Sequence, residues 1–235
     1  MAFAFVASNV YNSSSSVSIV ITKPTGTADN DIMFALLKLS GGSLADPTTV
    51  PTGWTLGAKR TGDANNTYWV YYKVAASEGA DYTWTWTLAA TRAGGTLCTY
   101  RDGFNTSTPI DVWSNTAYIT SDTIGRAASM TVAAANSPLI FFGCMGGSAD
   151  RTFGPPTNPT TFTEDYDGWD TTSRFARCFE SVVWTGSGAT GNIDSTLSLT
   201  TTDKHCFAVA LVPSGGGGGG PAAGLRTQAL LGVGL

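Results

Sequence analysis

Charged side chains are scarce in this sequence. Asp, Glu, Lys and Arg make up 13% of its 235 residues, which is roughly half the share found in an average soluble domain. The 17 acidic residues outnumber the 13 basic ones, so the formal net charge is −4. A chain without a basic excess is not expected to bind nucleic acid through its phosphates. The hydrophobic share of 42% excludes disorder driven by charge repulsion.

Residues that perform chemistry are few as well. His205 is the single histidine, and the chain contains neither a G-x-S-x-G motif nor a C-x-x-C pair. These absences argue against a Ser-His-Asp hydrolase, an imidazole-based metal site and a zinc or redox centre. The three glutamates are Glu78, Glu164 and Glu180, and no pattern pairs two carboxylates as a glycosidase requires. We therefore expect no enzymatic activity and no cofactor, with a polysaccharide depolymerase as the weaker alternative.

Long apolar runs are missing too. No stretch reaches the roughly 20 apolar residues that cross a bilayer, and residues 1–8 lack the basic start of a secretory signal. We expect a protein that is made in a cytoplasm, does not associate with a membrane and leaves the cell by lysis. The four cysteines are widely spaced, and either buried thiols or cross-strand disulfides fit the pattern of Cys98, Cys144, Cys178 and Cys206.

Short apolar or alternating runs fill most of the chain, with Gly, Pro, Asn, Ser and Thr between them. Residues 82–87 alternate aromatic side chains with threonines, which is typical of a strand with two different faces. Residues 31–39 have a helix-favouring composition, but turn signals on both sides predict a buried strand. Such runs recur roughly every 10 to 20 residues as far as residue 213, and we find no internal repeat. The pattern predicts an all-β fold, an antiparallel β-sandwich of the jelly-roll type.

The composition changes after residue 213. We expect a sandwich domain at 1–213, a glycine-rich linker at 214–220 that contains six consecutive glycines, and an apolar arm at 221–235. An apolar segment this short cannot bury its side chains by itself, so we expect it to dock on a neighbouring chain by adding a strand or by filling a groove. The residues expected to dock are Leu225, Arg226, Gln228, Leu230, Leu231, Val233 and Leu235.

Two further groups are candidate binding residues. Asp165, Asp167 and Asp170 surround Gly168 with the close spacing of calcium loops, although an ordinary acidic surface loop is the simpler interpretation. Trp169 and Trp113 lie beside Asp and Asn residues, where an exposed indole could stack on a sugar ring. Packing inside the protein is the alternative for both tryptophans.

One series of segments resembles a recurring pattern of phage and prophage structural proteins. It consists of residues 17–37, 51–56 (Pro-Thr-Gly-Trp-Thr-Leu), 68–75, 81–85, 100–103 and 108–111. Residues 225–231 are also similar to a closing Arg-x-Thr-Gln motif of phage virion proteins, with one residue missing between Arg226 and Thr227.

The resemblance implies a lectin-like sandwich of the concanavalin or LamG type, displayed on a virion as a capsid-decoration, neck, tail or fibre component. Its implied partners are other virion proteins and further copies of this chain, with a trimer expected for a fibre or decoration protein. It transfers no catalytic residue. The alternative function is a carbohydrate-binding module for adhesion to host glycans.

Overall fold

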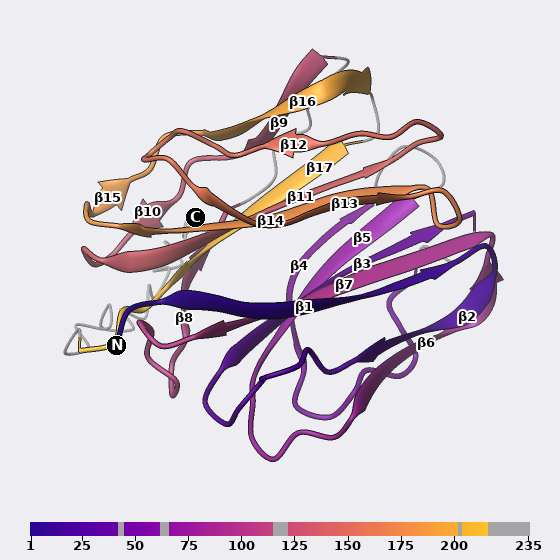
Figure 1. Cartoon of the computed structure of the whole chain (residues 1–235), viewed down its shortest axis with the longest axis horizontal. Coiled ribbons are helices and arrows are strands. Elements are labelled where there is room, and N and C mark those ends of the chain that lie inside the picture. The colour runs from indigo at the N-terminus through magenta and orange to yellow at the C-terminus, as the bar shows by residue number, and fades with distance from the viewer. Residues whose placement is uncertain (42–44, 62–65, 115–121, 202–203, 216–235) are drawn as a thin grey trace, which may run out of the picture.

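The protein is composed of antiparallel β-strands (Figure 1). A computed structural model describes residues 1–41, 45–61, 66–114, 122–201 and 204–215. Within these ranges there are 17 strands and no helix, and hence none that is long and apolar enough to span a membrane. The prediction of an all-β antiparallel sandwich is confirmed, whereas the concanavalin or LamG type stays a prediction.

The first half of the chain forms one sandwich. Its larger sheet has five strands in the order β1-β7-β3-β5-β4, and β2 and β6 pair on its outer side. Thr49 forms an isolated bridge with Thr85 and so continues the outer layer beyond β6. The bounds are β1 (Ala4–Ser13), β2 (Ser16–Thr22), β3 (Ile32–Ser40), β4 (Thr55–Thr61), β5 (Asn66–Val74), β6 (Asp81–Ala90) and β7 (Arg92–Arg101).

The second half forms another sandwich. Its larger sheet has the order β13-β14-β11-β17-β8, and its outer sheet has the order β12-β16-β9. The bounds are β8 (Ile110–Trp113), β9 (Asp122–Ala127), β11 (Ser137–Gly146), β12 (Phe153–Gly154), β13 (Thr163–Asp170), β14 (Phe175–Trp184), β16 (Ile193–Thr201) and β17 (Lys204–Leu211), with a short extra pair, β10 (Thr131–Val132) and β15 (Gly188–Ala189).

The two halves share one topology, which corrects the expectation that the chain has no internal repeat. When β1, β2, β3, β4, β5, β6 and β7 are matched in turn with β8, β9, β11, β13, β14, β16 and β17, every strand pairing of the first half recurs in the second. The bridge of Thr49 to β6 corresponds to the pairing of β12 with β16. The body is therefore built from two sandwiches of equal design.

The sequences of the two halves show little similarity at matching positions. Asn30 precedes β3 and Asn136 precedes β11, and both adopt a positive φ, of 73° and 62°. Pro-Thr-Gly-Trp-Thr at 51–55 and Pro-Thr-Thr-Phe-Thr at 159–163 lead into the matching strands β4 and β13. Two short similarities separated by dissimilar strands are too weak to indicate a repeat before the pairing is known.

Three apolar cores hold four layers together. Figure 1 shows the outer strands of the second half at the top, the two five-stranded sheets in the middle, and β2 with β6 at the bottom. One core lies inside each sandwich, and the third lies between the five-stranded sheets, where Phe34 meets Phe142 with ring centroids 5.4 Å apart. Because the middle sheets are covered on both sides, every residue of β3, β11 and β17 is buried. This explains why residues 31–39 lack a strand-like alternation.

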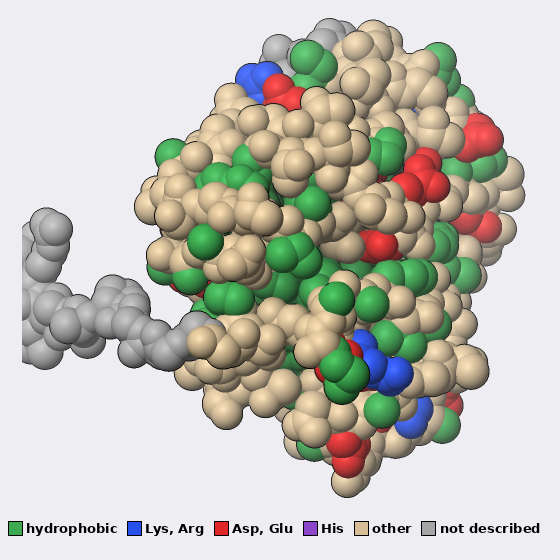
Figure 2. Space-filling model, turned by 60° about the vertical axis from the view of Figure 1, so that its left-hand side comes forward, with side chains coloured by type: hydrophobic (Ala, Val, Ile, Leu, Met, Phe, Trp, Pro, Cys, Tyr) green, Lys and Arg blue, Asp and Glu red, His purple; other side chains and the backbone are tan. Residues whose placement is uncertain are grey.

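The sandwiches are related approximately by a two-fold axis. Strand β1 packs beside β13, and its counterpart β8 packs beside β4, the counterpart of β13. The segment that joins the two halves lies beside the last described residues. Phe104 forms an isolated β-bridge with Pro213, and Ser214 N donates a hydrogen bond to Gly103 O at 3.0 Å. Figure 2 shows hydrophobic side chains gathered in a band between the upper and lower bodies on this side.

Candidate functional site

The three aspartates predicted to form a calcium loop lie on a strand instead. Strand β13 carries all of them, with a bulge between Glu164 and Tyr166. Asp165 faces Tyr100 and Ser181 in the core between the sandwiches. Asp167 points the opposite way and accepts a hydrogen bond from Phe153 N at 3.2 Å.

Asp170 ends β13 and accepts a hydrogen bond from Ser173 N at 2.7 Å, as a turn residue does. The strand therefore separates the three carboxylates instead of bringing them together. In the described part of the chain no three His, Cys, Asp or Glu residues are grouped so that they could hold a metal ion.

Burial changes the acidity of the two inward-facing aspartates. Desolvation raises the pKa of Asp165 to about 6, although the hydroxyls of Ser181 and Tyr100 act in the opposite direction. Desolvation also raises the pKa of Asp167 to about 6, against the hydrogen bond from Phe153 N. Both carboxyls thus change charge in mildly acidic solution.

Glu180 is the most strongly perturbed carboxyl whose pKa the structure resolves. It lies on β14 and is 0% exposed. Together with Ala176 and Cys178 it occupies the face of β14 that forms the core of the second sandwich. Neither of its carboxyl oxygens has a hydrogen-bond partner among the described residues. Desolvation raises its pKa to about 8, with a further increase from Asp167, while the Cys178 thiol opposes the shift. Glu180 is therefore mostly protonated at neutral pH.

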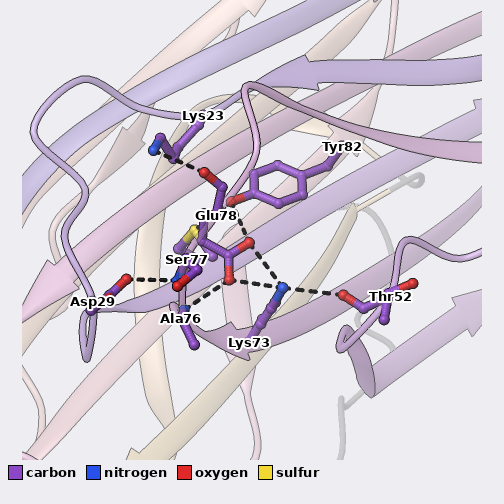
Figure 3. Close-up of polar contacts among 9 residues, drawn as sticks. Lys23, Asp29, Thr52, Lys73, Ala76, Ser77, Glu78 and Tyr82 are labelled. Carbon is purple, nitrogen blue, oxygen red and sulfur yellow. Dashed lines mark hydrogen bonds and ion pairs between the residues drawn. The ribbon is translucent and has the colours of Figure 1, made fainter.

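Glu78 has the opposite environment (Figure 3). Its carboxylate meets Lys73 Nζ at 2.8 Å and accepts hydrogen bonds of 2.9 Å from Ala76 N and from the Tyr82 hydroxyl. Desolvation acts to raise the pKa of Glu78, but the hydrogen bonds from Lys73, Ala76 and Tyr82 hold it below the usual value. All these partners serve to fasten the turn between β5 and β6, so this cluster is structural.

Both candidate sugar-binding tryptophans are partly buried by packing within the protein. The Trp113 indole stacks on Phe142, with centroids 6.0 Å apart at 26°. Gly57 lies so close to the indole that a Cβ at position 57 would be 2.1 Å from Trp113 Cζ2. Trp169 is half-buried against the core of the second sandwich, and its Nε1 is buried. Packing accounts for most of the surface of both side chains.

Trp113 nevertheless borders a pocket. Where β4 meets β8, at one side of the seam between the sandwiches, there is a half-open cavity of about 380 Å³. Its lining includes Ala58, Lys59, Arg60, Trp113, Ser114 and Phe207. The sequence did not indicate Arg60 as a functional candidate, because this residue stands in an ordinary polar run. Its surroundings in the pocket include Trp113 of β8, which only the tertiary structure places next to β4.

The remaining sequence candidates divide into two groups. The four cysteines are buried free thiols, so the disulfide alternative does not apply in this structure. The arm at 221–235 lies outside the described residues, together with its proposed docking side chains Leu225, Arg226, Gln228, Leu230, Leu231, Val233 and Leu235.

Comparison of the chain with protein-family models, with curated proteins and with solved structures finds no match in any of the three.

Proposed function

We propose that this chain is a non-enzymatic structural protein of a bacteriophage particle. The two stacked sandwiches are the displayed body, and residues 221–235 attach it to other virion proteins or to further copies of the chain. Its localisation is the virion, as a decoration, neck, tail or fibre component. The resemblance of the first-half segments and of residues 225–231 to phage structural proteins supports this assignment.

The observation that carries the proposal is that the body is complete before the linker begins. All three cores are made of residues that precede Val212. The last described turn is tied to the junction of the halves by the hydrogen bond from Ser214 N to Gly103 O. The apolar residues that follow the glycines are therefore not needed to build the described cores, and docking on another chain gives them a use.

The particle-assembly test compares the full chain with a version that ends at Ser214. Each is supplied to the phage that encodes the chain after deletion of the genomic copy, and protein bound to purified particles is measured by quantitative mass spectrometry. We expect the truncated protein to be at least tenfold depleted from particles. Its urea midpoint should match that of the full chain, because the three cores remain.

A matched pair of full-length variants separates the arm's side chains from its length. Leu230→Asp together with Leu231→Asp should reproduce the depletion, whereas Thr227→Ser should not. Light scattering of the purified full chain should give a homo-oligomer that dissociates in the truncated form. Normal incorporation of the truncated protein would contradict the proposal.

A further inference from the structure

The two sides of the seam between the sandwiches differ, although the approximate two-fold axis makes them equivalent. On the β1/β13 side, Arg177 Nη1 donates to Asn12 Oδ1 at 2.9 Å, and the guanidinium lies 4.7 Å from the centre of the Phe175 ring. Arg177 is 1% exposed, so this side is filled by the protein itself. On the β4/β8 side the described residues instead line the 380 Å³ pocket. Pockets at such internal interfaces are common ligand sites.

The described lining of the pocket carries positive charge. Lys59 and Arg60 are the charged side chains in its described lining, and no described carboxylate lines it. Lys59 is engaged elsewhere, since its Nζ lies 2.9 Å from Asp46 Oδ1 and 5.8 Å from the centre of the Trp69 ring. Arg60 Nε is buried and has no hydrogen-bond partner among the described residues. A planar guanidinium in this position suits a carboxylate, which it can bind through two parallel hydrogen bonds.

The remaining lining is apolar. Phe207 is 1% exposed beneath the pocket. Trp113 presents to the pocket the part of its indole that Phe142 and Gly57 leave uncovered, which is an apolar surface that C–H groups can contact. The Ser114 hydroxyl accepts a hydrogen bond from Ala208 N at 3.0 Å, which holds β8 against β17. A ligand that fits this lining needs both an anionic group and a compact body rich in C–H bonds.

We propose that this pocket binds a carboxylate-bearing sugar ring, that is, a uronic acid unit, with Arg60 holding the carboxylate and Trp113 and Phe207 contacting the ring. Such units occur as free sugar acids and within acidic polysaccharides, and the carboxylate on a pyranose is the chemistry common to both. This binding does not depend on the arm, so it can fail or succeed separately from the proposed role in a particle.

The experiment titrates the full chain with methyl β-D-glucuronide, methyl β-D-glucoside and sodium acetate at constant ionic strength, and follows binding by calorimetry and by the tryptophan indole N–H resonances in NMR spectra. We expect a millimolar or lower Kd for the glucuronide. The neutral glucoside and acetate should each bind at least tenfold more weakly, because each lacks one of the two recognised features. A glucuronide oligosaccharide added in a separate titration distinguishes a polysaccharide source from a free sugar acid.

Two substitutions test the role of Arg60. Arg60→Gln should weaken glucuronide binding at least tenfold, and Arg60→Lys, which keeps the charge but loses the planar fork, should give an intermediate loss. Arg92→Gln is the matched control, because Arg92 begins β7 and does not line the pocket. Thermal unfolding of each variant verifies that it is folded, and Arg60→Lys provides the comparison if Arg60→Gln is not.

Three results would overturn the proposal. One is the absence of glucuronide binding up to 50 mM, roughly the limit at which a weak sugar interaction is meaningful. Another is equal binding of the glucoside, which would show that the carboxylate is not recognised. Equal binding of acetate would show that the sugar ring contributes nothing.

Discussion

Replacement of Glu180 by glutamine should change how the stability of the protein depends on pH. The pKa of Glu180 is raised to about 8 in the folded protein from an ordinary value of 4.5, chiefly because burial disfavours its charged form. The folded state therefore keeps a proton that the unfolded chain has already released. Stability from this group is fully present below pH 4.5 and is lost as the pH rises towards 8.

The magnitude follows from linkage at about 1.4 kcal/mol per pH unit. Between pH 4.5 and pH 7 the wild-type protein should lose about 3 kcal/mol through Glu180 alone, and about 4 kcal/mol by pH 9, when its folded pKa has been passed. Glutamine has nearly the same shape and no ionisable proton, so Glu180→Gln removes this loss. The variant should be close to wild-type in stability at pH 4.5 and markedly more stable at pH 8.

The measurement is urea unfolding followed by tryptophan fluorescence at one-unit steps from pH 4.5 to 8.5. Other groups also titrate in this window, including Asp165 and Asp167 with a pKa of about 6, so the informative quantity is the difference between variant and wild type at each pH. Thr185→Ser is the control, because Thr185 is exposed just after β14 and its replacement changes no ionisable group. Its difference from wild type should stay nearly constant with pH. A constant difference for Glu180→Gln as well would refute the claim that its burial holds the proton.

Two further predictions concern the seam between the sandwiches. Gly57→Ala should cost about 1–3 kcal/mol in free energy of unfolding, because the new methyl group overlaps Trp113 in a packed interface; an unchanged urea midpoint would mean that the indole is not confined there. Residues 1–106 and 107–235, expressed separately, should each aggregate or remain partly folded, because each exposes one face of the central core. Mixed after denaturation, the two fragments should refold into a one-to-one complex with the fluorescence of the intact chain, and failure to associate would count against the central core as the joining interface.

The strand pattern shows how much of the fold can be predicted from the local sequence. The alternation at 82–87 predicts β6 correctly, with Tyr82, Trp84 and Trp86 buried in the first core. Residues 31–39 also form the expected strand, β3, but their sequence could not indicate why both faces are apolar. That reason lies more than a hundred residues away, in β11 and the other strands of the second sandwich, which cover the far side of the sheet.

The candidate site shows where local reasoning ends. Asp165, Asp167 and Asp170 are close in sequence, and a loop would have brought their carboxylates together. In a regular strand Asp165 and Asp167 would share a face, but the bulge between Glu164 and Tyr166 shifts the alternation, so the two carboxylates enter different cores. Glu180 stands among the apolar residues of β14, and its altered pKa depends on the outer sheet that excludes water from it. Arg60 becomes a binding candidate only through β8.

By itself the amino-acid sequence determined that the chain is charge-poor, strand-forming and antiparallel, because a period of two and turn residues act over a few neighbours. Only the tertiary structure decided that there are two sandwiches of one topology, which of their edges meet, and that one side of the seam between them is filled while the other side has a pocket. These properties arise from contacts between segments far apart along the chain, and such contacts depend on shape and pairing that the two halves share without sharing sequence.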